Sequence, residues 1–222
     1  MKTRALYWGA CAALVVAITG CSGDSDERRE KTLSASQVCD GTLTTPAADA
    51  LERIGGTASF TELDGTDGEG NPNSFSVELA AKRLHSKLGG RNECVLYKAG
   101  DQSGIYLLKV RFEPTESRPS PESSAKNGKG GDDSASYPIG LYAYTPADSG
   151  AYLYFACPTK GPEGDTPYVM ASMFSSENQT NPDSTGKDRM AVLNDVSRAL
   201  AKELGCAAQA ELPAEVPDPA SG

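Results

Sequence analysis

Four of the six cysteines in this 222-residue chain, those outside the expected export signal and lipid-attachment site, constrain its fold more than any other feature. They lie far apart along the sequence, without a Cys-x-x-Cys pair, and the chain has only one histidine. That pattern argues against a zinc site or a thioredoxin-like redox motif, and we expect neither a metal ion nor a cofactor. In an exported protein an even number of cysteines predicts disulfides instead. The four are Cys39, Cys94, Cys157 and Cys206.

Three pairings of these cysteines are compatible with the sequence. We favour Cys39–Cys94 together with Cys157–Cys206, because each bridge then encloses one half of the chain and leaves the long polar segment between the halves free. The other two pairings would bridge across that segment, which geometry permits but nothing in the sequence requires.

Residues 1–20 have the pattern of an export signal. Lys2 and Arg4 precede an apolar stretch, 6–18, that is too short to span a bilayer and remain there. The segment that follows, Ile18-Thr19-Gly20-Cys21, resembles the bacterial lipobox, in which a diacylglyceryl group is attached to the cysteine and the preceding peptide bond is cut. We therefore expect Cys21 to be lipidated and the protein to lie on the outer face of the cell membrane. The alternative is an ordinary signal peptide with a chance cysteine.

The charge of the mature chain limits its partners. Of the 21 basic residues, Lys2 and Arg4 lie in the signal, so 19 remain against 30 acidic residues, a formal net charge of −11. Nucleic acid and anionic lipid headgroups are poor partners for such a chain. Contact with the membrane is expected through the lipid anchor alone.

Composition divides the remainder into one domain with loose ends. Residues 21–36 are polar and charged and predict a flexible tether. A single domain is expected over 37–208, interrupted by a Pro-, Ser- and Gly-rich disordered loop at 113–138. Residues 209–222 predict a disordered tail.

Periodicity and turn chemistry predict a mixed fold. Apolar residues with helical spacing, together with capping signals, indicate helices over 45–55, 74–88 and 187–204. Alternating or short apolar runs indicate strands over 57–63, 94–98, 105–112, 139–145, 151–157 and 168–174. This order favours an α+β fold, with a mainly antiparallel sheet, helices packed on one face, and two disulfides.

Three segments together resemble a family of envelope proteins. They are Cys39-Asp-Gly-Thr-Leu-Thr-Thr-Pro-Ala-Ala-Asp-Ala-Leu-Glu-Arg-Ile-Gly-Gly56, Cys94-Val-Leu-Tyr97 and Leu200-Ala-Lys-Glu-Leu-Gly-Cys206. The chain is thereby similar to the cysteine-stapled cell-envelope lipoproteins of high-GC Gram-positive bacteria, most of which have no assigned activity. The resemblance implies a location and a fold. Leu96 stands where many of those chains have tryptophan.

Motifs for catalysis or metal binding have little support. His85 is the only imidazole, and we interpret it as an exposed histidine on a helix. The familiar hydrolase motifs are missing from the sequence. Residues 64–71 gather carboxylates and glycines as calcium loops do, but without the alternating ligand register of such loops, so we interpret them as a turn. We expect no catalytic residue and no metal ligand.

Tyrosines mark the best candidate for a binding surface. If 146–150 is a hairpin turn, Tyr144 lies opposite Tyr152 and Tyr142 lies opposite Tyr154. The other face of this hairpin is aliphatic and is expected to pack under the last helix. Tyrosine combines a large contact area with a polar tip and is enriched at binding surfaces. The alternative is that these tyrosines only stiffen the hairpin or are covered by the polar loop.

These observations favour a membrane-anchored extracytoplasmic lipoprotein that acts as a binding module of the cell envelope. Its expected partner is an envelope protein or a cell-wall component. Two other interpretations stay open: an enzyme or accessory factor of envelope metabolism, and a receptor that hands a small solute to a transporter.

Overall fold

The structure is a computed structural model that describes most of the chain after residue 30. The predicted signal peptide, Cys21 and the first part of the predicted tether lie outside the described residues. The described ranges are 31–68, 70–118, 134–146, 150–162 and 164–220.

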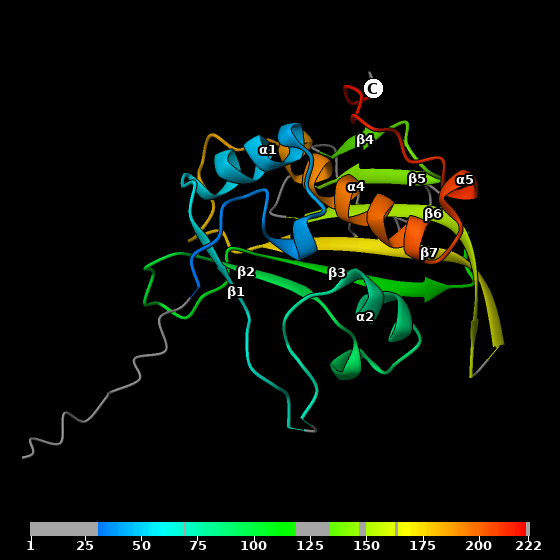
Figure 1. The fold of residues 1–222 in the computed structure, drawn as a ribbon. Coiled ribbons are helices and arrows are strands. Elements are labelled where there is room, and N and C mark those ends of the chain that lie inside the picture. Colours follow the sequence, from blue (N-terminus) through cyan, green and yellow to red (C-terminus); the bar gives the residue numbers. More distant parts are fainter. Residues whose placement is uncertain (1–30, 69, 119–133, 147–149, 163, 221–222) are drawn as a thin grey trace, which may run out of the picture.

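One antiparallel sheet of seven strands organises the described chain (Figure 1). The strands lie in the order β1-β2-β3-β7-β6-β5-β4. Their bounds are β1 Phe60–Glu62, β2 Cys94–Lys98, β3 Leu108–Thr115, β4 Ala135–Tyr137, β5 Tyr142–Thr145, β6 Gly150–Gly161 and β7 Gly164–Ser175. The predicted antiparallel sheet is confirmed.

The centre of the sheet is a long hairpin made by β6 and β7. Buried and more exposed residues alternate along much of both strands, because successive side chains of a strand point to opposite faces of the sheet. One face carries small and large apolar residues, such as Leu153 opposite Ala171, and these are fully buried. This alternation places the apolar core on one side of the sheet. The other side carries the side chains that are not part of this core.

The helices cover the core side of the sheet (Figure 1). They are α1 Thr45–Gly55, α2 Val77–Lys82, α4 Gly186–Glu203 and α5 Ala207–Ala210, with short 3-10 turns at Cys39–Gly41 and Leu88–Gly90. Helix α4 packs on β5, β6 and β7, and both α1 and α2 pack on α4. The predicted fold class is confirmed.

Residues with known capping preferences mark both ends of α1 and the start of α4. Pro46 lies in the first turn of α1, and Gly56 ends the helix in the left-handed conformation at φ 62°. At the start of α4, Thr185 and Asp188 form a reciprocal capping box. Gly186 allows this helix end to approach the sheet, because a Cβ atom there would lie 2.5 Å from Thr145 Oγ1.

Both disulfides have the favoured pairing. Cys39–Cys94 joins the first 3-10 turn to β2, with the Cα atoms 5.5 Å apart. Cys157–Cys206 joins β6 to the chain just after α4, at a Cα separation of 5.2 Å. The second bridge therefore fastens the end of the main helix to the sheet.

The ends of the domain differ from the prediction. Residues 31–36 belong to the domain rather than to a tether, because Leu33 exchanges backbone hydrogen bonds with Phe60 and Ala35 is buried. The predicted tail, 209–222, is also packed as far as residue 220: Val216 is buried and Ala220 donates its N–H to Ser136. Both segments have a largely polar composition. Composition does not reveal backbone hydrogen bonds between segments or the burial of a single apolar side chain.

The predicted loop 113–138 is shorter than expected. Strand β3 continues to Thr115, and β4 begins at Ala135. Polar residues form these strand ends because their backbone groups pair with β7 and β5, whatever the side chains are. Residues 119–133 lie outside the description. The predicted second helix is shorter too, because α2 ends at Lys82.

Candidate functional site

The predicted tyrosine register is confirmed. Tyr142 pairs with Tyr154, and Tyr144 pairs with Tyr152, across β5 and β6. The rings of Tyr144 and Tyr152 stack with centroids 4.9 Å apart, and those of Tyr142 and Tyr154 are 6.4 Å apart. All four lie on the sheet face opposite the helices.

Only two of these four tyrosines are accessible. Tyr144 and Tyr152 are buried, with 2% and 7% of their surface exposed, whereas Tyr142 and Tyr154 are half-buried. The prediction of a four-tyrosine binding face is therefore corrected to two accessible members over a buried pair. Alternation fixed the face on which the rings lie, but it could not show which of them are covered.

The accessible surface continues onto the next strand. Met170 pairs with Tyr154, and Phe174 packs edge-on against Tyr152 at a centroid distance of 5.8 Å. We call the half-buried side chains of Tyr142, Tyr154, Met170 and Phe174 the aromatic face. Met170 and Phe174 were not predicted as members, although the alternation within β7 places them on the face opposite Val169, Ala171 and Met173.

Charged residues adjoin the aromatic face on β3 and beside β2. Glu113 lies opposite Met170 in the register and forms an ion pair with Arg91 at 2.9 Å. Glu93 binds Arg111 at 2.5 Å and Lys109 at 3.6 Å. These side chains are 16% to 31% exposed, and each of the two carboxylates is paired with at least one cation. The surface thus combines aromatic area with paired charges.

Tyr154 presents a neutral hydroxyl on this surface. Burial raises the pKa of Tyr154, and the neighbouring Tyr152, Glu113 and Tyr142 raise it further. The phenol therefore stays protonated at neutral pH and can both donate and accept a hydrogen bond.

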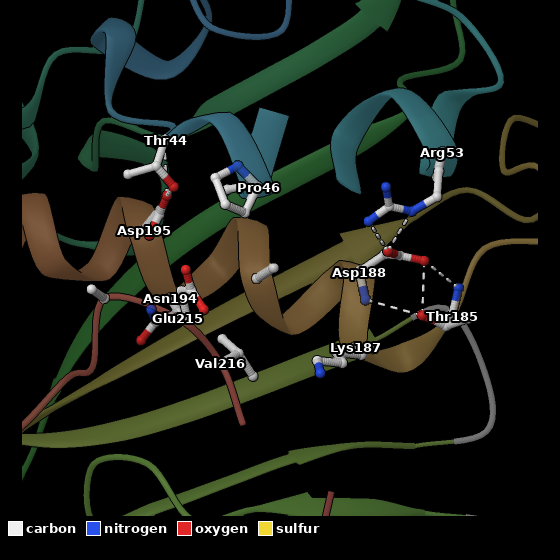
Figure 2. Close-up of a pocket in the computed structure, with 13 residues that line it drawn as sticks. Thr44, Pro46, Arg53, Thr185, Lys187, Asp188, Asn194, Asp195, Glu215 and Val216 are labelled. Carbon is white, nitrogen blue, oxygen red and sulfur yellow. Dashed lines mark hydrogen bonds and ion pairs between the residues drawn. The ribbon is translucent and has the colours of Figure 1, made fainter. Parts of the chain in front are cut away.

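A second candidate site, which is a pocket, lies on the helical side of the molecule (Figure 2). It is a pocket of ≈ 310 Å³ between α1, the first half of α4 and the C-terminal segment at 214–216. Sequence analysis did not find it, because its walls come from three distant parts of the chain. We call it the α1–α4 pocket.

Two buried carboxylates hold the walls of this pocket together. Asp195 accepts hydrogen bonds from the N–H and hydroxyl of Thr44 at 2.8 and 2.5 Å. Asp188 accepts from Arg53 at 2.7 Å and from the N–H and hydroxyl of Thr185 at 2.9 and 2.8 Å. Both carboxylates thus join the two helices or cap one of them, and Figure 2 shows them on the same side of α4.

The ionisation of Asp188 follows from these contacts. Burial by itself raises the pKa of Asp188, but the hydrogen bonds from Arg53 and Thr185 outweigh burial and lower the pKa below its ordinary value of 3.8. The folded state therefore favours the ionised form. Its stabilising contribution is present above pH 3.8 and is lost as the pH falls through the folded-state pKa.

We expect Asp188→Asn to lower the free energy of unfolding by about 2 kcal/mol at pH 7, since it removes the charged acceptor from the capping box and from Arg53. The difference from the wild type should shrink as the pH falls below 3.8 and through the lower pKa of the folded-state carboxyl, which then becomes protonated. Urea unfolding at pH values from neutral to about 2.5 measures both effects.

Asp183→Asn is the matched control for this measurement. It removes the same charge from an exposed position just before α4, and it should leave stability nearly unchanged at each pH. A difference between Asp188→Asn and wild type that does not vary with pH would contradict the assignment.

Asn194 lines the α1–α4 pocket, and its side-chain amide has one unpaired atom. Its side chain is 1% exposed, and Nδ2 donates to the carbonyl of Pro213 at 2.9 Å. Its Oδ1 is buried and has no hydrogen-bond donor among the described residues. Leaving a buried acceptor unpaired costs about 1–3 kcal/mol, so this arrangement requires an explanation.

Other residues singled out in the sequence have structural roles. His85 is not an exposed helical side chain, because it lies beyond α2, is half-buried, and its Nε2 is 2.9 Å from Thr159 Oγ1 on β6. In the predicted turn at 64–71, Asp67 accepts from the N–H and the amide of Asn71 at 2.8 and 2.9 Å. The first contact joins the segment after α2 to β6, and the bonds of Asp67 close the turn on itself.

A half-buried carboxylate lies beside the first disulfide. Glu62 accepts the N–H of Cys39, and burial raises the pKa of this carboxyl. Its oxygen and the sulfurs of Cys39 and Cys94 lie within 4.8 Å of one another. The two sulfurs are bonded to each other and cannot act as thiolate ligands, so this group is a bridge with a hydrogen-bonded neighbour.

Comparison with known proteins adds no relative. No family model, no curated protein and no solved structure matches this chain. Within the described ranges, none of the helices has the length and apolar character needed to cross a bilayer.

Proposed function

We propose that this protein is a lipid-anchored, extracytoplasmic binding module of the cell envelope, and that it binds an envelope protein through the aromatic face. The observation that carries the proposal is the asymmetry of the sheet. Helices cover one side (Figure 1), whereas the other side carries half-buried aromatic residues beside paired charges.

The composition of this face favours a protein partner. Tyrosine, methionine, phenylalanine and arginine are enriched at protein interfaces, and tyrosine residues often dominate the binding free energy. Tyr142, Tyr154 and Met170 follow one another across three neighbouring strands, so they offer a continuous contact on a rigid support. The paired charges of Glu93, Arg111 and Glu113 lie at its border, where they can select a complementary partner.

Substituting both Tyr142 and Tyr154 with serine tests the proposal. Truncating one well-packed interfacial tyrosine costs about 1–2 kcal/mol, so the double variant should weaken capture of the partner at least about tenfold. The measurement is site-specific photo-crosslinking in intact cells with a crosslinking residue at position 142 or 154. A discrete protein adduct is expected from both positions, and it should fade when the remaining tyrosine is serine.

Lys202→Ser with Glu203→Ser is the matched control. These exposed residues end α4 on the opposite side of the sheet, and crosslinkers placed there should give no such adduct. Equal adducts from both sides, or adducts found only with cell-wall material, would contradict a protein partner on the aromatic face. Circular dichroism of the double tyrosine variant checks that the fold is intact.

A further inference from the structure

The aromatic face ends at a pocket beside β4, the last strand of the sheet (Figure 1). We call it the edge pocket; it has a volume of ≈ 500 Å³, and Tyr142 belongs both to its wall and to the aromatic face. Ser136, another wall residue, pairs with Tyr144 in the register. Its side chain therefore lies on the same face of the sheet as the four tyrosines. The edge pocket thus extends the aromatic face to the edge of the sheet.

Backbone contacts shape the edge pocket. Gly140 has a left-handed φ of 58°, and a Cβ atom there would lie 2.5 Å from the carbonyl oxygen of Tyr154. The next residue, Leu141, donates its N–H to that carbonyl at 2.8 Å. On the outer side, Ala220 donates its N–H to the carbonyl of Ser136 at 2.8 Å. The walls are therefore held in place by the fold itself, which lowers the cost of ordering them around a ligand.

The wall of the edge pocket is uncharged. None of the described residues that line it carries a charge at neutral pH. A charged ligand would lose hydration here without gaining an opposite charge, and this is unfavourable. Pro138 is exposed, and Leu141 and Tyr142 are half-buried, so apolar and aromatic side chains are accessible in the pocket. The occupant that suits this wall is uncharged and apolar over most of its surface.

The volume and the position of the edge pocket indicate an aromatic side chain. Small organic ligands occupy sites of about 300–1,000 Å³, so a volume of ≈ 500 Å³ accommodates a ring as large as indole. The ring of Tyr142 forms part of the wall, and aromatic rings attract one another at centroid distances of about 4.5–7 Å. Protein interfaces depend on a few large side chains inserted into pockets, and tryptophan and tyrosine are frequent among them.

We propose that the edge pocket binds a large, uncharged aromatic side chain of the protein that contacts the aromatic face. The ring lies against Pro138, Leu141 and Tyr142, and the rest of the partner continues over Tyr154 and Met170. This inference rests on the proposed function and narrows it. The partner is a protein that presents a protruding aromatic residue at the border of its contact surface.

Three capped amino acids test the pocket without the partner. In amide-resolved NMR spectra of the purified mature protein, N-acetyl-L-tryptophanamide should give saturable shifts at Ser136 and Leu141. N-acetyl-L-leucinamide should bind about fivefold more weakly, because it lacks the aromatic contact with Tyr142. N-acetyl-L-lysinamide should bind at least about tenfold more weakly, because the pocket offers no opposite charge. Equal affinities for the three probes would overturn the proposal.

Ser136→Trp should abolish saturable binding of N-acetyl-L-tryptophanamide, because its own indole ring would occupy the edge pocket. Ser59→Trp is the matched control: it adds the same ring at an exposed serine just before β1, at the other edge of the sheet, and should bind the probe like the wild type. Leu141→Ala removes one wall and should weaken binding about fivefold. Circular dichroism checks each fold. Undiminished binding by Ser136→Trp and Leu141→Ala would overturn the proposal, as would an equal loss with Ser59→Trp.

Photo-crosslinking in intact cells separates this inference from the proposed function. With the crosslinking residue at position 154, the protein adduct should fade when Ser136→Trp is added and remain when Ser59→Trp is added. An equally strong adduct with both variants would overturn the role of the edge pocket and leave the proposed function standing. No adduct from the chain without either variant would contradict the proposed function, whereas a loss of selectivity for the tryptophan probe contradicts the pocket inference alone.

Discussion

Cys21→Ser is expected to move the protein from the membrane fraction to the culture medium. The proposed lipid chains on Cys21 would attach the mature chain to the membrane, whereas its net charge opposes binding to anionic headgroups. Two acyl chains anchor a protein stably, and their loss leaves no comparable attachment. Cell fractionation followed by immunoblotting measures the shift, which should involve nearly all of the protein.

Cys11→Ser provides the control, since Cys11 lies within the predicted signal and should be removed with it. Its fractionation should match that of the wild type. Mass spectrometry of the wild-type N-terminal peptide decides the chemistry: the peptide should begin at Cys21 and carry the mass of a diacylglyceryl group. A different first residue, or an unmodified Cys21, would show that the anchor assignment is wrong.

Replacing both Cys157 and Cys206 with alanine should lower the free energy of unfolding by about 4 kcal/mol. The bridge spans a sequence separation of 49 residues, and the chain-entropy model assigns that value to a loop of this length. The two sulfurs are buried between β6 and the end of α4, so the variant also loses packing there. Guanidinium unfolding under non-reducing conditions measures the loss.

The Cys39→Ala and Cys94→Ala pair is the matched comparison. Its sequence separation of 55 residues predicts a similar loss, within a few tenths of a kcal/mol in the entropic model. A loss below about 1 kcal/mol at Cys157–Cys206 would contradict the view that this bridge restricts the unfolded chain. Each double variant also serves as a check on disulfide connectivity, because the remaining pair should still form.

Local sequence patterns predicted much of the fold because the features concerned are local. Pro46 and the glycine at 56 fix the two ends of α1 through their own backbone preferences. The position of the turn at 146–150 fixed the register that places Tyr142 opposite Tyr154, and alternation in β5 and β6 fixed the face on which both rings lie. The enclosed halves of the chain favoured the disulfide pairing that the structure confirms.

Only the tertiary structure decided which groups form a site. Thr44 and Asp195 are 151 positions apart, and Arg53 and Asp188 are 135 apart, yet both pairs meet at the α1–α4 pocket. Periodicity shows that a side chain faces the core or the solvent, but it does not identify its partner. The same reason explains why the burial of Tyr144 and the unpaired oxygen of Asn194 could not be predicted. Each depends on contacts between segments that are brought together only when the sheet, the helices and the C-terminal segment pack.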